Sequence, residues 1–599
     1  MSKMKKMNIL SKTIVMALCM FACADLDLPN DGRISYQELF STYNRIKSYY
    51  NQCVAIQGIG FNYANTPLAS FCDEAHDASD MTAGSVFNWY NDRTSPTSDP
   101  LGGYWGGGYT VIGKCNTFLK YMTDPELPYQ FKNPDEKDGL IAQVRVARAY
   151  YYLQLIKRYG GCAIVDVPYE VDHDFSKVER ATFEEVADFI IAECDIALAA
   201  KETEGMPFGL RWAISDTERG QITRAFAYAV KSQTALYAAS PLWYTPGSKY
   251  TWEKATAITK EALDQCLTHG FQLHNRTVAS TVAQNPYAHY FMTRSDASRS
   301  WDRETIFESD IQLSVWSLAG LPVTTGMTKA GPGPSQELVD SYEMQTSGEP
   351  PILGYSDADH LEVIPNLTSG YDPNNPYVGR DPRFYASIYY NGAIQNLANQ
   401  TPIVETYVGG NCGISDQVTD IRFTRTGYYM RKFNNYRSDN LLNSDGYMRI
   451  FRLGELYLNF AEAAYQSVGP DVPVVSTSGI ILSARDAVNA VRRRAEMPNF
   501  PAGMTKENFE KKYRNERRVE LAFEEHRFYD VRRWKILHQT DGFVTGMRII
   551  PEGGNLTYNR IKLADRGTNA DKYLILPLDA AEAQKMETLT GEEWQNPGW

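Results

Sequence analysis

Apolar residues recur at helical spacing over long stretches of this chain, and this periodicity constrains its fold more than any other feature. An apolar residue at every third or fourth position gives a helix one face that must be buried against another element. Thr182 and Glu185 have the spacing of a capping box, which marks the first turn of a helix. The sequence therefore predicts a mainly α-helical scaffold of paired antiparallel helices, with segments at 140–159, 182–200, 221–239, 252–267, 448–466 and 483–495.

The middle of the chain has a different composition. Between about residues 275 and 445, Gly, Pro, Asn and Tyr are frequent, and short β-like runs occur at 306–309, 385–390 and 428–433. Aromatic residues continue through this region, so we interpret it as a loop-rich, partly β second lobe rather than a linker. The helical scaffold is then discontinuous in sequence, covering about 33–270 and again about 446–535.

Residues 513–535 form the densest charged block, YRNERRVELAFEEHRFYDVRRWK. Apolar side chains fall on one face of a helix drawn through it, namely Val519, Phe523 and Val531. Opposite charges also stand three residues apart, in the pairs Arg517–Glu520 and Arg527–Asp530. This pattern predicts a surface helix with salt bridges along it.

The N-terminus has the parts of a bacterial lipoprotein signal. Several lysines precede an apolar run at 14–22 that is too short to span a bilayer, and Ala22 stands before Cys23. The alternative is an ordinary cleaved signal in which Cys23 is incidental. We expect residues 1–22 to be a signal peptide and Cys23 to be the lipidated first residue of the mature chain. Acyl chains make such anchoring stable, because each buried methylene adds about 0.8 kcal/mol.

Composition excludes several classes of protein. A formal net charge of −12 argues against general affinity for nucleic acid. No segment after the signal has the long uncharged apolar run of a transmembrane helix. The cysteines beyond Cys23 are odd in number and lack C-x-x-C spacing, which indicates neither a disulfide framework nor a zinc site. Most are expected to be small buried side chains; one disulfide is compatible with the sequence, but its partners cannot be read from it.

Two patterns that suggest chemistry are weak. Residues 108–115 read GYTVIGKC, which satisfies G-x-x-x-x-G-K but has Cys115 where a phosphate-binding loop needs Ser or Thr. We interpret this stretch as the opening of a helix. Asp77 with Asp80, and Asp357 with Asp359, could supply two carboxylates for glycoside hydrolysis, but such pairs in polar loops are more often turns or calcium ligands. We therefore expect no enzymatic activity and no cofactor, although the Asp-rich turns permit a structural calcium ion.

Taken in order, several motifs resemble those of the SusD/RagB-like family of outer-membrane nutrient-binding lipoproteins. Those in the C-terminal part are ARDAVNAVRRRAEM at 484–497, the 513–535 block and a final QNPGW at 595–599. Earlier ones are RAYYYL at 148–153 with YGG at 159–161, ETIF at 304–307, DPRF at 381–384, GY at 427–428 with KF at 432–433, and RLGE at 452–455. The resemblance runs along nearly the whole chain, so we expect residues 23–599 to form a single SusD-like domain.

The resemblance implies a tetratricopeptide-like helical scaffold and a function. Family members sit at the outer membrane as lids over a SusC-like TonB-dependent β-barrel transporter and deliver nutrients to it. We therefore expect a lipid-anchored, surface-exposed protein that captures oligosaccharides and works with such a transporter. Capture of a peptide or another nutrient by the same architecture remains the alternative, although no exposed strand edge or groove that would bind peptide can be read from the sequence.

Residues 87–93, FNWYNDR, supply the side chains that sugars require. Flat aromatic faces suit the C–H-rich faces of pyranoses, and planar polar groups suit their hydroxyls. We expect Trp89 and Tyr90 to stack on a ligand, with Asn91 and Arg93 hydrogen bonding beside them. By resemblance to glycan-binding relatives, Trp316, which follows the ETIF strand, completes an aromatic arc, and Trp301 is a weaker candidate. The competing interpretation is that the aromatic residues at 89 and 90 only anchor a loop in the core.

Overall fold

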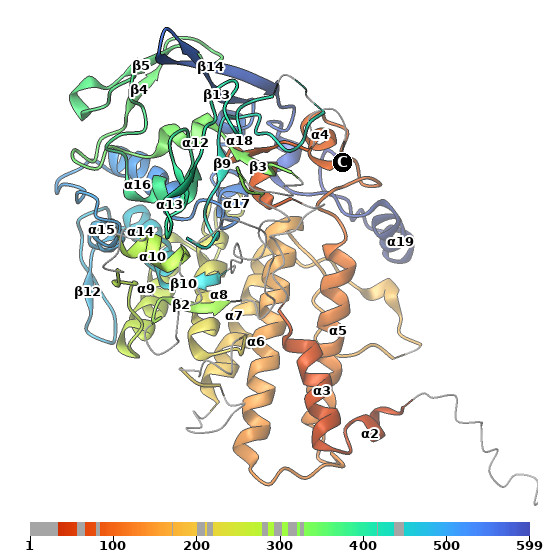
Figure 1. The fold of residues 1–599 in the computed structure, drawn as a ribbon. Helices are drawn as coiled ribbons and strands as arrows, with labels where there is room; N and C mark the ends of the chain where they lie inside the picture. The colour runs from red at the N-terminus through yellow and green to blue at the C-terminus, as the bar shows by residue number, and fades with distance from the viewer. Residues whose placement is uncertain are drawn as a thin grey trace, which may run out of the picture.

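The computed structural model describes residues 34–56, 66–79, 84–170, 172–200, 210–212, 220–277, 285–292, 302–308, 320–323, 329–415, 417, 419–436 and 449–599. Within these residues the protein is mainly helical (Figure 1). Long helices occupy one end of the molecule, and a lobe of loops and short strands covers the other. Residues 1–33 lie outside the described part of the chain, so the signal peptide and Cys23 remain predictions.

The scaffold consists of helices that pack on one another in chain order. They are α3 (Tyr43–Val54), α5 (Tyr104–Met122), α6 (Pro134–Tyr159), α7 (Phe183–Ala199), α8 (Arg224–Ala238) and α9 (Trp252–Thr268). The chain returns after the loop-rich lobe with α14 (Leu453–Ser467), which packs on α9, and α15 (Ala484–Arg494), which packs on α14. Two sequence-distant segments therefore share one scaffold, and Figure 1 shows α3, α5 and α6 side by side.

Local sequence explains where these helices begin. The Thr182 hydroxyl accepts a hydrogen bond from the Glu185 amide at 3.2 Å, and the Glu185 carboxylate accepts one from the Thr182 amide at 2.8 Å. This is the predicted capping box. Helix α8 buries its alanines, which lets its neighbours approach closely. The 448–466 prediction was wrong at its start, because residues 449–452 form strand β10 (Arg449–Arg452) before α14 begins.

The strands of the described residues pair as two-stranded antiparallel sheets. The pairs are β1 (Ala75–Asp77) with β3 (Pro332–Pro334), β2 (Thr305–Glu308) with β10, β4 (Ile352–Tyr355) with β5 (Val363–Pro365), β6 (Ile388–Tyr389) with β9 (Tyr429–Met430), β7 (Ile394–Asn396) with β8 (Thr401–Ile403), β11 (Val474–Val475) with β12 (Ile481–Leu482), and β13 (Phe543–Glu552) with β14 (Asn555–Asp565). The predicted strand at 385–390 is confirmed only at residues 388–389, which form β6. Residues 385–387 belong to helix α13 (Pro382–Ser387), which Asp381 caps by accepting from the Arg383 amide at 2.9 Å. The long β13–β14 hairpin was not predicted.

Several other helices are short. They are α2 (Tyr36–Leu39), α4 (Ser85–Tyr90), α10 (Pro286–Met292), α12 (Gln336–Ser341), α18 (Leu537–Thr540) and α19 (Ala580–Thr590), with 3-10 turns η1 (Leu68–Phe71), η2 (Phe175–Lys177), η5 (Leu367–Ser369) and η6 (Asp571–Leu574). Gly108–Cys115 lies inside α5, as predicted, and is not a phosphate-binding loop. All the cysteines in the described part of the chain are buried. No helix in that part is long and apolar enough to cross a membrane.

The 513–535 block is two helices rather than one. Helix α16 (Lys506–Glu520) ends before a tight turn, and α17 (His526–Arg533) follows it. Phe523 and Glu525 in that turn have positive φ angles of 62° and 70°, which no helix accommodates. The predicted ion pairs are also wrong: Arg517 pairs with Asp530 at 2.7 Å, and Arg527 pairs with Asp73 at 2.8 Å.

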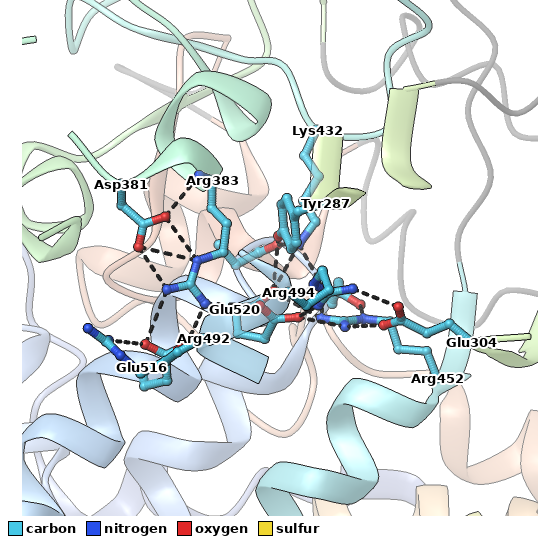
Figure 2. A network of polar contacts seen from close by, with 12 residues as sticks. Tyr287, Glu304, Asp381, Arg383, Lys432, Arg452, Arg492, Arg494, Glu516 and Glu520 are labelled. Carbon is cyan, nitrogen blue, oxygen red and sulfur yellow. Dashed lines mark hydrogen bonds and ion pairs between the residues drawn. The ribbon is translucent and has the colours of Figure 1, made fainter. Parts of the chain in front are cut away.

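The charged face of α16 is buried, which corrects the prediction of a surface helix. Glu520 accepts hydrogen bonds from Arg452 of the scaffold at 2.7 Å, from Arg383 of the second lobe at 2.9 Å and from Arg494 of α15 (Figure 2). Glu516 accepts from Arg492 at 2.7 Å and from Arg383 as well. We call these residues, with Glu304, Asp381, Lys432 and Glu524, the buried ion network. Because its members come from both lobes, it fastens the loop-rich lobe to the scaffold.

Candidate functional site

Trp89, the leading candidate for stacking on a ligand, lies in the core. Its side chain is 0 % exposed and packs edge-on against Tyr573 at 5.2 Å and Phe71 at 5.8 Å, with Phe528 at 6.1 Å. Neither face of the indole is open to solvent. The predicted stacking role is therefore corrected for Trp89: its neighbours in the fold come from residues far away in sequence, and they enclose it.

Tyr90 is buried for a related reason. It is 3 % exposed, its hydroxyl donates to the Ser70 carbonyl at 2.7 Å, and the Arg566 guanidinium lies 3.9 Å from the centre of its ring. The cation covers the face that a sugar would need. The stacking role expected for Tyr90 is corrected as well, and both aromatic residues anchor α4 to the core.

Asn91 and Arg93 differ from the two aromatic residues, because they are exposed. The Asn91 amide donates to the Phe87 carbonyl at 2.8 Å, and the Arg93 guanidinium lies 5.2 Å from the centre of the Phe87 ring. Their side chains remain accessible to a ligand, so their predicted role stays a prediction. Trp316 and Trp301 lie outside the described residues.

A pocket opens next to α4, at the start of α5. Its volume is about 590 Å³, within the range of about 300–1,000 Å³ that small-molecule sites occupy. We call it the α5 pocket. It is lined by Ser85 and Asn88 of α4, by residues 96–100, 102–103 and 105–106, by Tyr159 at the end of α6, and by Pro577, Asp579 and Glu582 near the start of α19.

Two aromatic side chains form the apolar part of the α5 pocket. Trp105 is 7 % exposed and packs edge-on against Tyr159, with ring centres 5.4 Å apart. Gly103 precedes them as the N-cap of α5 and has a φ of 83°, a conformation that glycine adopts without strain. A Cβ added to Gly103 or Gly106 would meet no atom within 4 Å, so the pocket is open on this side.

Asp99 is the most distinctive polar group of the pocket. Its Oδ1 accepts a hydrogen bond from the Leu101 amide at 2.9 Å, whereas its Oδ2 is buried and has no hydrogen-bond partner among the described residues. Burial raises the pKa of Asp99 to about 6, although the Leu101 amide and Arg158 act in the opposite direction. A buried carboxylate oxygen without a donor is costly, and a ligand hydroxyl could satisfy it.

The sequence-distant wall of the pocket is fixed by hydrogen bonds. The Ala580 amide donates to the Pro96 carbonyl at 3.0 Å, which ties the start of α19 to the loop. Asp579 caps that helix by accepting from the Ala581 and Glu582 amides at 3.0 and 3.2 Å. The acidic side chains of residues 579 and 582 are thereby held at the rim of the pocket.

The C-terminal motif QNPGW holds the same wall in place. The Asn596 amide donates to the Tyr159 carbonyl at 3.0 Å and to the Leu576 carbonyl at 2.7 Å, and Gln595 exchanges hydrogen bonds with Leu578. The Trp599 indole donates to the Ile575 carbonyl at 2.9 Å. The chain end is therefore part of the frame of the α5 pocket.

A second, larger cavity of about 930 Å³ lies along α16, between α12, strand β4 and α18. We call it the α16 groove. No aromatic side chain lines it, and its charged groups pair with one another or with neighbours, as Lys512 does with Glu349 at 3.1 Å and Arg527 with Asp73 at 2.8 Å. Its chemistry suits an ionic or extended ligand better than a sugar.

The acidic pairs noted in the sequence have structural partners. Both oxygens of Asp357 accept from backbone amides of the turn at 361–362, and Asp359 pairs with Lys562 at 2.8 Å. Asp77 accepts from the Ser79 amide at 2.8 Å, and Asp80 lies outside the described residues. Within the described ranges, no group of three or more His, Cys, Asp or Glu side chains could hold a metal ion.

None of the described residues that the sequence predicted for ligand binding, Trp89, Tyr90, Asn91 and Arg93, lines the α5 pocket. Sequence reasoning selected 87–93 for its aromatic content, whereas the pocket is lined by Asn88, the polar run at 96–100 and Trp105. The richness of that run in Ser, Thr, Asp and Pro, followed by a glycine cluster, is a signal that could have identified it. No signal in the sequence indicates that residues 577–582 form another wall of the same pocket.

Comparison with known proteins identifies the family. The sequence profile of the SusD family matches residues 291–599, and a second profile, described as starch-binding and associating with the outer membrane, matches residues 26–202. The chain belongs to the SusD family. The resemblance inferred from its motifs is thereby confirmed. No curated protein matches the chain significantly.

Solved structures of other SusD-like proteins share the fold. A SusD-like protein from Bacteroides fragilis is 25% identical, has a TM-score of 0.71, and the match covers 94% of this chain and 98% of that one. A SusD-like carbohydrate-binding protein from the same species is 20% identical, with a TM-score of 0.64 and coverage of 92% and 99%. A surface glycan-binding protein from Bacteroides fluxus is 18% identical, with a TM-score of 0.55 and coverage of 93% and 100%. The predicted mainly α, SusD-like fold is confirmed.

Proposed function

We propose that this SusD-family protein captures oligosaccharides in the α5 pocket and delivers them to a SusC-like TonB-dependent transporter of the outer membrane. The observation that carries the proposal is that one open pocket contains both aromatic side chains, Trp105 and Tyr159, and a buried carboxylate oxygen of Asp99 that has no hydrogen-bond partner among the described residues. Trp105 offers an apolar edge to sugar C–H groups, while Asp99 and Asn88 offer hydrogen bonds to hydroxyls.

Matched variants on the two walls test this site. Asn88 lines the pocket, whereas Asn91 stands on the same turn and does not; Glu582 lines it, whereas Glu587 lies further along α19 and does not. We expect Asn88→Ala and Glu582→Gln to weaken glycan binding about 2- to 10-fold each, the value of one hydrogen bond. Asn91→Ala and Glu587→Gln should leave binding unchanged.

The assay is titration calorimetry of the full chain against a glycan selected on an array, with thermal melts to show that each variant folds. If Asn91→Ala and Arg93→Ala lose binding while Asn88→Ala and Glu582→Gln do not, the exposed loop predicted from the sequence is the site instead of the α5 pocket. Incubated glycan should be recovered uncleaved, because we propose binding without hydrolysis.

Anchoring and the transporter are part of the same proposal. Cys23 would carry the lipid, so a fatty-acid probe should label the wild type but not Cys23→Ala, and equal labelling would exclude this anchor. A ligand captured outside the cell needs a channel to cross the outer membrane. Purification from native membranes in mild detergent should recover a TonB-dependent barrel, and recovery of a free monomer would count against the pairing.

The α16 groove favours one alternative, the capture of peptides. It offers alternating charges without an aromatic face, as ionic or extended ligands require. Binding to many peptides and to no glycan, abolished by Lys511→Ala in the groove and unaffected by Asn88→Ala, would support this alternative over oligosaccharide capture.

A further inference from the structure

Three aromatic side chains lie together at the surface, in the segment that follows α6. The rings of Tyr169 and His173 stack with their centres 3.8 Å apart and an angle of 19° between their planes. Phe175 stands edge-on to both, at 5.3 Å from Tyr169 and 4.9 Å from His173. Tyr169 is 37 % exposed and Phe175 is 39 % exposed. We call these three residues the Tyr169 platform.

The platform differs from the aromatic pair of α4, which the fold covers. Trp89 is enclosed in the core, and a guanidinium lies over the ring of Tyr90. Within the described part of the chain, the ring contacts of Tyr169 are with His173 and Phe175 alone, and no cation lies over its ring. Exposed apolar groups that lie together mark interaction sites, and an exposed aromatic ring is what a pyranose needs for stacking.

The segment that carries the platform is fixed to the scaffold. The Asn116 side chain of α5 donates to the Val165 carbonyl at 2.8 Å. The Arg148 guanidinium of α6 donates to the Asp166 carbonyl, also at 2.8 Å. Because these bonds hold the backbone just before the rings, a ligand that stacks on them orders little of the chain. The platform is therefore preorganised for binding.

The end of the same segment joins the frame of the α5 pocket. The Arg180 guanidinium donates to the Tyr159 carbonyl at 2.9 Å and to the side-chain oxygen of Asn596 at 2.7 Å. The turn η2, which begins at Phe175, packs on α19, and residues near the start of α19 line the pocket. The platform and the pocket therefore border the same helix, which lies at the edge of the molecule (Figure 1).

The charge around the platform indicates the class of ligand. Residues 166–180 include five acidic side chains against Lys177 and Arg180, and Arg180 is bound to the frame of the pocket. The α5 pocket is lined by three acidic side chains and by no basic one. Carboxylates accept hydrogen bonds from sugar hydroxyls and repel sulfate, uronate and phosphate groups. Both surfaces therefore suit a neutral sugar chain better than an anionic glycan or an anionic lipid surface.

We propose that the Tyr169 platform is a second sugar-binding surface, on which the outer part of a neutral oligosaccharide stacks while its end lies in the α5 pocket. The inference rests on the proposed function, because it extends the same ligand beyond the pocket. The exposed carboxylates of Glu170 and Asp174 lie in the same segment and can accept from the hydroxyls of the stacked sugar.

Binding at two linked surfaces predicts a dependence on chain length. A chain held in the pocket presents its outer sugars to the platform at a high effective concentration. Affinity should therefore rise with length until the chain spans from the pocket to the platform, and it should stay constant for longer chains. A pocket without the platform would give an affinity that depends little on length.

The test begins with an array of neutral, sulfated and uronate-bearing oligosaccharides, followed by titration calorimetry of the full chain with a length series of the strongest neutral hit. Tyr169→Ala and Phe175→Ala should each lower the affinity for the longest chain about 5- to 30-fold and leave that for the shortest binding chain unchanged. Thermal melts should stay close to wild type, because both side chains are partly exposed.

Tyr36→Ala is the matched control for loss of an exposed tyrosine. Tyr36 is 50 % exposed and stacks on Tyr121, which lies at the end of α5 opposite to the pocket. We expect this variant to bind every chain length as the wild type does. Wild-type binding of every length by Tyr169→Ala and Phe175→Ala as well would overturn the platform and leave the α5 pocket standing.

Variants of the pocket separate this inference from the proposed function. Asn88→Ala and Glu582→Gln should weaken the binding of every chain length by the same factor, because they change the α5 pocket alone. If they leave binding unchanged while Tyr169→Ala weakens it, the pocket is overturned and the platform is the sugar site. Absence of binding to any glycan by the wild type would overturn both.

Two further outcomes concern the occupant. Sulfated or uronate-bearing chains should bind about tenfold more weakly than neutral chains of the same length, with the largest difference at low salt. Equal or tighter binding of the anionic chains would overturn the assignment to neutral sugars. If Tyr169→Ala keeps its glycan affinity but no longer recovers a membrane protein from native membranes, the platform is a protein contact and the proposal is overturned.

Discussion

Replacing Glu520 by Gln tests whether the buried ion network holds the two lobes together. Glu520 is 0 % exposed and accepts from Arg452 at 2.7 Å and from Arg383 at 2.9 Å, as well as from Arg494. Burial alone raises the pKa of a carboxyl, yet these guanidinium groups hold the pKa of Glu520 well below its usual range. Glu520→Gln keeps the shape of the side chain and removes the charge at the centre of the network.

The expected loss of unfolding free energy depends on the carboxylates that each arginine still contacts in Glu520→Gln. Arg452 still has Glu304 at 2.9 Å and Glu524 at 2.7 Å, Arg383 still has Glu516 and Asp381, and Arg494 still has Glu304 at 2.6 Å. Removing one partner of a buried ion pair costs about 3–5 kcal/mol. Because no arginine is left without a carboxylate, we expect the lower end, about 3 kcal/mol of unfolding free energy, from the same estimate.

Urea unfolding of the full chain measures this cost, with Glu510→Gln as the matched control. Glu510 stands on the same helix and pairs with Arg514, four residues further on, and both side chains are partly exposed; a pair of this kind contributes about 0.3–0.5 kcal/mol. We expect the unfolding midpoint of Glu520→Gln to fall well below that of Glu510→Gln at neutral pH, with similar denaturant slopes.

The pH dependence has a defined sign. A carboxyl with a depressed folded-state pKa stabilises the fold above its unfolded pKa, near 4.3, and loses that contribution as pH falls through the folded value. Glu524 of the same network has a pKa lowered to about 2, against the effect of burial, by Arg452 and Lys432. The stability gap between wild type and Glu520→Gln should therefore shrink as pH falls below about 4.3. Equal unfolding midpoints for Glu520→Gln and Glu510→Gln at pH 7 would falsify the reasoning.

Three other outcomes are expected. Trp89→Ala should cost about 3–5 kcal/mol of stability, as for a buried aromatic, while folded protein binds glycan normally; a stable variant that fails to bind would restore the stacking role. Burial raises the pKa of Glu525 to about 8, so between about pH 4.3 and 8 the folded state binds a proton that the unfolded state has lost, and the stability of the wild type falls as pH rises. The unfolding free energy of Glu525→Gln should therefore increase relative to that of the wild type by up to about 1.4 kcal/mol per pH unit across that window, and a constant difference in urea melts would refute this. Glycan affinity should rise as pH rises through about 6, because ionised Asp99 is the stronger acceptor, and calorimetry of Asp99→Asn should show no such rise.

The scaffold could be predicted from the sequence because helical periodicity is local. Helices α7 and α9 begin and end within about two residues of the predicted limits, and the capping box of Thr182 and Glu185 forms as its spacing indicates. Each of these features depends on side chains only a few positions apart. The packing of α14 on α9 has no such local signal, and the sequence did not predict it.

The turn between α16 and α17 shows what the local pattern misses. Phe523 and Glu525 adopt positive φ although neither is glycine, and the sequence around them favours helix. The Phe523 amide donates to Glu74 at 3.2 Å, and the Glu524 carboxylate accepts hydrogen bonds from Arg452 and Lys432, which come from other parts of the chain. These distant partners outweigh helix propensity, and no pattern within residues 513–535 contains them.

The same dependence on distant residues explains the burial of charge and of Trp89. Arg and Glu are usually exposed, so a block rich in both is predicted to face solvent. Here Arg383 comes from the second lobe and neutralises α16 across the interface. Trp89 is enclosed by Phe528 and Tyr573, which follow it by more than four hundred positions in the chain. Composition could propose an aromatic site at 87–93, but only the fold could show which rings were already covered.

The motifs that identify the family and the residues that line the α5 pocket are largely different sets. DPRF supplies Arg383 and RLGE supplies Arg452 to the buried ion network, and QNPGW fastens the pocket wall through Asn596. Asn88, Asp99 and Glu582 at the rim belong to none of these motifs. A frame fixed by buried hydrogen bonds can therefore keep its geometry while the rim changes. In the proposed site, the motifs would fix the position of the pocket, and side chains outside the motifs would set the specificity for a particular glycan.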